Sequence, residues 1–292
     1  MWAQRQIVES ARTSATISYL LNTISTYGTE RRLFGSTNPE VSQRYDTLVT
    51  PKGWAFAIWA LIFIGETLGL ICIWSNDGYA KYYDSILVPF TYACLLQSLW
   101  CVFFSKELIL LSAIALTGIA YNLKICSDNI FEIAVTEVIE KVVQIPVIID
   151  ILITIPIRIH FVWTVAASII NWNMVITTLN KPKYEIFPAL FSIWIAAGIG
   201  AYRALFLSDA VFPAVLAWAY AAMSAKIRSS PPENFSKDGP FLEVSTVQSL
   251  LYTFYYFLII CFIYVSSCFV MLCCFMFIYL FFLFFCVNSF FS

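Results

Sequence analysis

The sequence has very little of the chemistry that soluble enzymes rely on: one histidine in 292 residues, and only 12% charged residues. A single histidine excludes a metal site built from several histidines. The nine cysteines contain no CxxC pair, so neither a zinc site nor a disulfide framework is expected. Glycine-rich phosphate loops, Walker motifs and nucleophile elbows are also missing. We therefore expect no enzyme, no catalytic residues, no metal and no cofactor, and the net charge of −1 gives no reason to expect nucleic acid as a partner.

Apolar residues, by contrast, make up 60% of the chain, and its mean hydropathy is +0.79. Such a composition is typical of a multi-pass integral membrane protein in contact with the lipid bilayer. Because a helix satisfies its own backbone hydrogen bonds in lipid, we expect an all-α, polytopic transmembrane helical bundle of about six to eight spans. The apolar runs that predict these spans lie at residues 54–74, 85–104, 107–123, 145–179, 186–202 and 209–225. The sequence leaves open whether the membrane is organellar and whether the protein is a homodimer.

Composition divides the chain into four segments. Residues 1–50 are polar and basic, and they fit a targeting segment, an interfacial helix or a marginal first span. Residues 51–225 form the expected membrane bundle, and residues 226–249 are a polar loop. Residues 250–292 are an apolar tail, rich in phenylalanine and cysteine, without a charged residue. This tail fits one or two extra spans or the translation of thymine-rich non-coding sequence, and we expect it to lie outside the working bundle.

One apolar run, at residues 145–179, is too long for a simple crossing, since ~35 residues at 1.5 Å each exceed a ~30 Å hydrocarbon core. It fits two spans broken near Pro156 and Arg158. It also fits one span at 156–179 that follows a surface segment holding Asp150.

The distribution of lysine and arginine favours the single crossing. Basic residues are biased to one side of the membrane only if that run crosses once, as the positive-inside rule requires. We therefore expect the N-terminus and the 226–249 loop on one side of the membrane, and the 124–144 loop on the other.

The stretch TPKGWAFAIWALIFIGE, which begins at residue 50, carries the clearest functional signal. On a helix Trp59, Phe63 and Glu66 share one face, so an aromatic stripe ends in a carboxylate at membrane depth. A carboxylate in that position is expected to be protonated or paired, because an isolated charge in lipid is costly. Arg158 and His160 are the candidate partners.

Polar and aromatic side chains also share faces on two later runs. Gln97 and Trp100 lie on one face of the second run, and His160, Trp163 and Asn171 lie on one face of the fourth. Polar groups at this depth usually face a bundle interior or a cavity. Hydrogen bonds between helices explain these polar groups as well as a ligand does, and ordinary ring packing explains the tryptophans as well as a pocket does.

These residues, taken in order, resemble the tryptophan-rich sensory protein/translocator protein (TspO/MBR) family. The resemblance rests on Trp54-x-Phe56-x-x-Trp59 after Pro51, on Gln97-x-x-Trp100 before Phe103-Phe104, and on Trp163-x-x-x-Ala167-x-x-x-Asn171. It covers residues 50–225 and is closest to the longer members, which have extra helices after a five-helix core. The family implies binding of porphyrin-like or sterol-like molecules, with transport or sensing as proposed roles.

The sequence departs from the family pattern at several points. Trp54 and Trp59 are five residues apart where compact members have six, and Phe63 stands where they have tyrosine. Gln97 replaces an asparagine, and Trp100 lies one residue nearer its phenylalanine pair. One residue rotates a helical side chain by about 100°, so the family's pocket cannot be carried over intact.

The leading hypothesis is a membrane-embedded protein that binds, transports or senses a planar hydrophobic ligand such as a tetrapyrrole or sterol. The expected ligand-binding residues are aromatic walls and polar side chains that orient the ligand: Trp54, Phe56, Trp59, Phe63, Gln97, Trp100, His160, Trp163 and Asn171. His160 as an axial ligand of haem iron is a narrower version of this hypothesis. The alternative is an ion- or proton-coupled transporter or channel whose polar path is lined by Glu66, Asp150 and Arg158.

Overall fold

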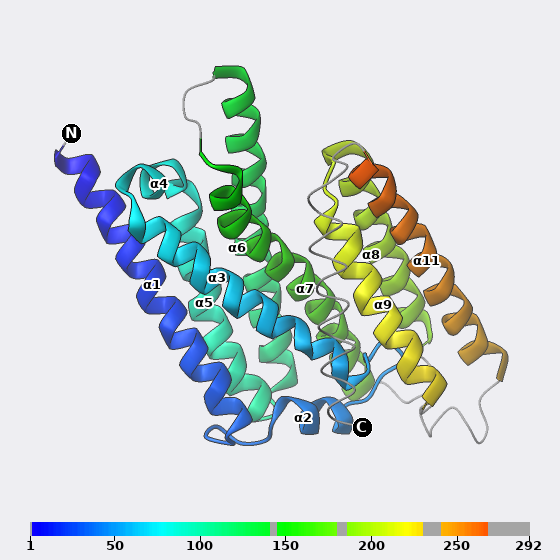
Figure 1. Ribbon diagram of the computed structural model, residues 1–292. Coiled ribbons are helices and arrows are strands. Elements are labelled where there is room, and N and C mark those ends of the chain that lie inside the picture. The colour runs from blue at the N-terminus through cyan, green and yellow to red at the C-terminus, as the bar shows by residue number, and fades with distance from the viewer. Residues whose placement is uncertain (1, 141–144, 180–185, 230–240, 268–292) are drawn as a thin grey trace, which may run out of the picture.

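A computed structural model describes residues 2–140, 145–179, 186–229 and 241–267, and every regular element in these ranges is a helix (Figure 1). The long helices are α1 (Trp2–Glu30), α3 (Ile58–Ser75), α5 (Asp84–Ser105), α6 (Ile109–Glu140), α7 (Val147–Leu179), α8 (Ile186–Leu207), α9 (Val211–Ser229) and α11 (Phe241–Ser267). Short helices occupy the connections: α2 (Asn38–Arg44), the 3-10 helix η1 (Gly53–Ala57) and α4 (Asp77–Tyr82). The all-α prediction is confirmed.

Within the described residues, six helical segments are long and apolar enough to cross a membrane. They are Gly53–Ser75, Asp84–Ser105, Ile109–Ala134, Val147–Leu179, Ile186–Leu207 and Val247–Ser266. Large apolar side chains point outward from these helices, as lipid-facing surfaces require. The chain is therefore a multi-pass integral membrane protein, as its composition predicts.

Helix α1 is not among those six, yet its two faces are arranged as in a helix that crosses lipid. Its outward face is apolar and exposed, and it carries Ile17, Leu20, Leu21, Ile24 and Tyr27. Its buried face is polar, and it carries Ser18, Asn22, Ser25 and Thr29. Because the polar side chains point inward, the low hydropathy of this segment reflects its contacts with other helices, and it favours a first span over an interfacial helix.

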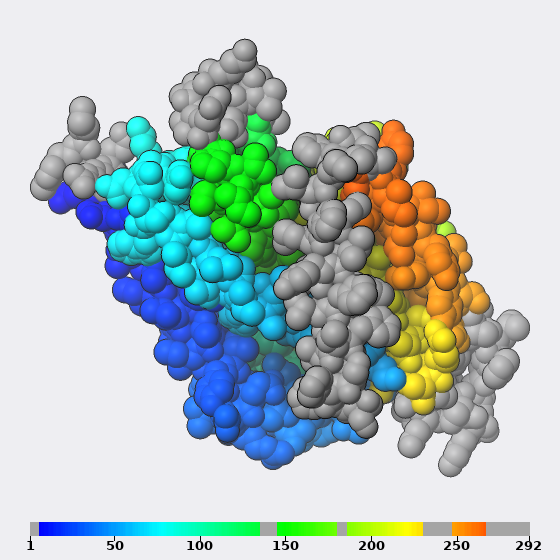
Figure 2. Space-filling view, in the orientation of Figure 1, coloured from blue at the N-terminus to red at the C-terminus, as the bar shows by residue number. Residues whose placement is uncertain are grey.

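The helices form two groups (Figure 1). In the first group, α1, α3, α7, α6 and α5 pack in that order into a closed ring, since α5 lies along α1 again. In the second group, α8, α9 and α11 pack on one another and meet the ring through α7. The surface shows the same division, with blue to green atoms on one side and yellow to orange atoms on the other (Figure 2).

This grouping differs from the division expected from composition. The ring begins with α1, within the segment that we predicted to be separate from the bundle, and it ends with α7. The bundle also continues through α11, which packs against α8 and α9, although we expected the tail from residue 250 to lie outside it. Residues 268–292 of that tail lie outside the described residues.

Helix α7 is continuous over 33 residues, with Pro156 inside it, which excludes two spans broken near Pro156. Its N-terminal part, which holds Asp150, continues the same helix and is not a separate surface segment. Helix α6 likewise runs on to Glu140, through most of the predicted 124–144 loop.

Side-chain pairs between the long helices and the connecting segments identify the two ends of the bundle. At one end Arg12 of α1 hydrogen-bonds Asp77 of α4, with Nη1 3.1 Å from Oδ1. At the other end Lys226 of α9 lies 3.2 Å from Asp46, and the Lys52 N–H donates to the Ala222 carbonyl at 3.0 Å. The start of α1 and the end of α9 lie at opposite ends of the bundle (Figure 1). This arrangement argues against a shared side for the N-terminus and the 226–249 loop, and the side of the membrane that each faces stays a prediction.

Candidate ligand site inside the five-helix ring

Two glycines of α3, Gly65 and Gly69, lie one helical turn apart and allow α3 to pack closely against α7. A Cβ added to Gly65 would lie 2.5 Å from Cγ of Pro156, and one added to Gly69 would lie 2.9 Å from the Leu152 carbonyl oxygen. Small residues four apart let two membrane helices pack backbone to backbone. Here they bring the residue between them, Glu66, against the inner face of α7.

Glu66 and His160 form a buried pair at this contact. Oε1 of Glu66 lies 2.7 Å from Nδ1 of His160, and the side chains are 1% and 0% exposed. The expected requirement for a partner is thus met by His160. Arg158, the other candidate, instead pairs with Asp209, which precedes α9.

Aromatic rings enclose this pair on the side toward η1. The Trp59 ring meets the His160 ring edge to face, with 5.5 Å between centroids, and meets Trp163 at 6.4 Å. Phe56 contacts Trp163 at 5.9 Å, and Phe63 contacts Trp59 at 5.9 Å. Edge-to-face contacts of this kind stabilise a ring cluster. The structure therefore brings together four of the predicted aromatic residues around His160.

Several buried polar atoms on α3, α5 and α7 have no hydrogen-bond partner among the residues that the structure describes. They are Oε2 of Glu66, Nε2 of His160, Nε1 of Trp163, Nε1 of Trp100 and both amide atoms of Gln97. Leaving a buried polar group unpaired costs about 1–3 kcal/mol. Such groups are rare in a native interior, and each of them calls for an explanation.

The helix rise sets the depth of these groups along the ring. Phe90 of α5 and Ile157 of α7 line one small cavity together with Glu66, about 20 Å³ in volume. Both helices run in the same direction from that level (Figure 1). At 1.5 Å per residue, Gln97 and Trp100 then lie about 10–15 Å below it, at the depth of Trp163 and the turn that follows it.

Two predicted site residues have other contacts. Asn171 accepts a hydrogen bond from the Ser112 hydroxyl of α6 at 2.7 Å, so for this residue the interpretation as a link between helices holds. Trp54 packs edge to face on Trp218 of α9, with 4.8 Å between centroids, outside the ring.

Sequence reasoning also missed Asn22, a buried residue of α1 whose Nδ2 has no partner among the described residues. Its position on the polar face of α1 was the available signal.

The residues of the alternative polar path do not meet. Asp150 accepts a hydrogen bond from the Tyr83 hydroxyl at 2.7 Å, while Glu66 pairs with His160. Arg158 joins Asp209, whose carboxylate also receives Nε of Arg203 at 2.8 Å. Each ionisable group therefore has its own partner in a different part of the fold, and the three do not line one path.

A family model described as TSPO-like protein matches residues 12–265 of the chain. The match includes most of α1 and nearly all of α11, and with them the whole ring and the three helices packed on it. No curated protein and no solved structure matches the chain.

Proposed function

The chain belongs to the TSPO-like family, and we propose that the interior of its five-helix ring binds a planar hydrophobic ligand such as a tetrapyrrole or a sterol. The aromatic rings of Phe56, Trp59, Phe63 and Trp163 would supply apolar faces for it, and Trp100 would add one from α5. Flat apolar molecules suit such faces because aromatic rings stack on extended ring systems.

The observation that carries this proposal is the set of unpartnered, buried polar atoms on α3, α5 and α7. Trp163, Trp100 and Gln97 each offer an N–H donor that no described residue accepts. A ligand with several acceptor groups at its edge would satisfy more of these donors than a ligand with one hydroxyl. The site therefore favours a tetrapyrrole, with its carboxylates, over a sterol.

His160 has a distinct role in this proposal. Its Nδ1 faces the Glu66 carboxylate, and its Nε2 has no partner among the described residues. A carboxylate that holds one ring nitrogen fixes the orientation of the other, which is the arrangement common for histidines that bind metals. In a haem complex, His160 would thus be the residue suited to contact the iron.

Ligand binding requires movement of side chains. Trp163 is 1% exposed, and the cavity beside Glu66 has a volume of about 20 Å³, close to that of one water molecule. We therefore expect Trp59 and Trp163 to change rotamer when the ligand enters, because their edge-to-face contact occupies the space between α3 and α7.

A titration of the purified protein tests the proposal. Protoporphyrin, haem and a sterol would be added in turn while tryptophan fluorescence is followed. We expect Trp59→Phe and Trp163→Phe each to weaken binding by about tenfold, since a lost aromatic contact is worth ~0.5–1.5 kcal/mol beyond area. Trp194→Phe is the matched control, because Trp194 is 57% exposed on α8. Equal affinity in all three variants would contradict the site.

Proton-coupled transport is a second candidate function, favoured by the Glu66–His160 pair alone. A carboxylate and an imidazole in contact inside a membrane can exchange a proton as the ligand comes and goes. Flux in proteoliposomes would decide: Glu66→Gln should abolish coupling to a pH gradient, and coupling that survives in this variant would exclude the pair as the proton carrier.

A further inference from the structure

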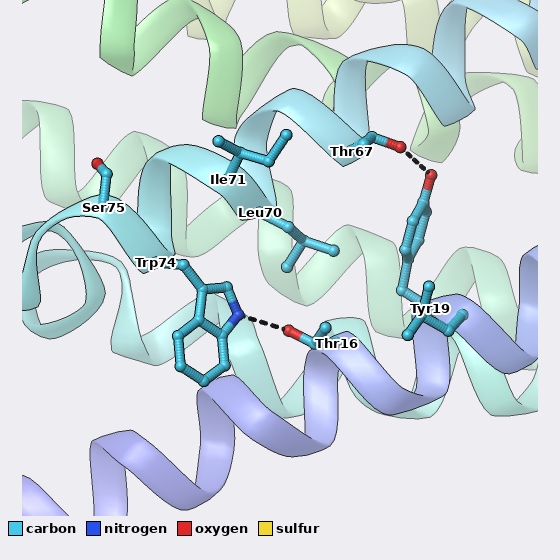
Figure 3. Close-up of a pocket in the computed structure, with 8 residues that line it drawn as sticks. Thr16, Tyr19, Thr67, Leu70, Ile71, Trp74 and Ser75 are labelled. Atoms are coloured by element: carbon cyan, nitrogen blue, oxygen red, sulfur yellow. Dashed lines mark hydrogen bonds between the residues drawn. The ribbon is translucent and has the colours of Figure 1, made fainter.

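A groove on the outer surface of the ring separates α1 from α3 (Figure 3). Its walls include Thr16, Tyr19 and Leu20 of α1, and Thr67, Leu70 and Trp74 of α3. The groove opens toward lipid, because Leu20 is 53% exposed and Ile71, beside Leu70, is 58% exposed. It lies outside the ring interior, so the inference below does not depend on the ligand site proposed above.

Two hydrogen bonds cross the groove and divide its length. Trp74 donates from Nε1 to the Thr16 hydroxyl at 2.8 Å, and the hydroxyls of Tyr19 and Thr67 are 2.7 Å apart (Figure 3). Thr67 and Trp74 are seven residues apart on α3, which corresponds to about 10 Å along the helix. Two long side chains thus reach from one helix to the other and leave a gap between the backbones.

The polar atoms of the groove are already satisfied within the protein. The Tyr19 hydroxyl also donates to the Phe63 carbonyl at 2.7 Å, Thr16 donates to the Arg12 carbonyl at 2.9 Å, and Ser75 donates to the Cys72 carbonyl at 2.7 Å. The groove therefore offers an occupant apolar contacts and no unsatisfied hydrogen bond. A hydrocarbon chain fits this chemistry better than any polar molecule.

The size of the groove sets the length of that chain. Its volume is about 490 Å³. On α3 it runs from Thr67 to Ser75, about 12 Å along the helix, so it accommodates part of one extended acyl chain of a membrane lipid.

Charged groups mark the end of the groove near Trp74. The Arg12 guanidinium lies 4.0 Å from the centre of the Trp74 ring and contacts Asp77 at 3.1 Å. Arg12 is only 6% exposed, and its Nε has no partner among the described residues. Asp77 is 68% exposed. The buried cation, Arg12, complements the phosphate of a zwitterionic lipid headgroup, and the exposed anion, Asp77, complements its ammonium. Trp74 fits the same place, because tryptophan is enriched at the headgroup level of membranes.

We propose that the groove between α1 and α3 binds one zwitterionic phospholipid, with an acyl chain along Leu20 and Leu70, its phosphate at Arg12 and its ammonium at Asp77. The lipid fills the space that the two crossing side chains hold open. It thereby completes the contact between α1 and α3, which is the weakest seam of the ring.

Native mass spectrometry of the delipidated full-length protein, titrated with a palmitoyl-oleoyl phosphatidylcholine, tests the acyl-chain site. Ile71→Trp places a ring in the groove from an exposed position, and we expect it to weaken retention of one lipid about tenfold, the effect of displacing about two methylene groups. Ile64→Trp is the matched control, since Ile64 is also on the lipid side of α3 and 63% exposed. Equal retention in both variants would overturn the proposal.

A second measurement uses the unmodified protein and so does not depend on the folding of a variant. Retention of phosphatidylcholines with chains of 8 to 18 carbons should rise with chain length and level off once the chain is longer than the groove, because further methylene groups then make no contact with it. Retention that does not depend on chain length would contradict an acyl chain in the groove.

The headgroup assignment has its own comparison. Wild-type protein should prefer phosphatidylcholine over phosphatidylglycerol, and Asp77→Asn should remove that preference, because Asp77 is the group that meets the ammonium. Equal retention of the two lipids by the wild type would overturn the headgroup assignment.

Discussion

Glu66 shows how a single polar residue in an apolar helix determines its surroundings. It lies in the middle of α3 with one carboxylate oxygen 2.7 Å from His160 and the other without a partner among the described residues. Its position at membrane depth predicts a partner, but the sequence could not choose between Arg158 and His160. Two residues correspond to about 200° around a helix, so the choice depends on which face of α7 meets α3, which is a tertiary property.

The pair itself predicts strong energetic coupling between Glu66 and His160. His160→Leu leaves a buried carboxylate without its partner, and we expect a loss of about 3 kcal/mol in the free energy of unfolding. Glu66→Leu with His160→Leu should cost clearly less than the two single losses added together, because no polar group then remains unpaired. Unfolding of the four proteins in mixed detergent micelles would measure the cycle. Additive losses would mean that the two side chains do not interact.

The contacts between helices show which parts of the candidate site could be predicted from the sequence. Trp59, Phe63 and Glu66 share a face as predicted. Two residues of α7 contact this face: His160 meets Trp59 and Glu66, and Trp163 meets Trp59. Trp54 was predicted on the same wall, but it lies in η1, before α3 begins, and its ring packs on Trp218 of α9 instead. The spacing Gly65-x-x-x-Gly69 was the unused signal, since it predicts a close helix pair beside Glu66.

The close contact of Gly65 on α3 with Pro156 on α7 predicts that a larger side chain at residue 65 destabilises this helix pair. Gly65→Ala places a methyl group 2.5 Å from Pro156, so the helices must separate by several tenths of an ångström. We expect a loss of about 1–3 kcal/mol in the free energy of unfolding, the usual effect of overpacking, together with weaker ligand binding. Gly198→Ala is the matched control, because no atom lies within 4 Å of the added Cβ. Equal stability of the two variants would show that the contact is not tight.

At the scale of the whole molecule, the described part of the chain combines a ring of five helices with three further helices on one side of α7. The apolar runs predicted most of these helices, but not which of them form the ring. Helix α1 was predicted only as an interfacial helix or a marginal first span, because Ile17, Leu20 and Ile24 follow helical spacing while the intervening positions are polar and buried. Average hydropathy cannot detect such a helix, whereas the spacing of its apolar residues could have done so.

The arrangement of α1 fixes a topology that can be measured. With every natural cysteine replaced, Ser10→Cys at the start of α1 and Asp77→Cys should react from the same side of the membrane. Ser229→Cys at the end of α9 should react from the opposite side, because Lys226 and Asp46 lie at the other end of the bundle. An impermeant thiol reagent applied to sealed vesicles distinguishes the two sides. Labelling of Ser10→Cys and Ser229→Cys from one side would place α1 outside the membrane.

The central claim is that the ligand site is the ring interior around His160, and light-driven oxidation by bound protoporphyrin tests it most directly. Illuminated protoporphyrin oxidises nearby tryptophan and histidine, and peptide mass spectrometry locates the products. We predict that Trp59, His160 and Trp163 are oxidised first, while Trp194 on the outer face of α8 is oxidised no faster than in a control with unbound sensitiser. Rapid oxidation of Trp194, with Trp59 and Trp163 spared, would contradict the account.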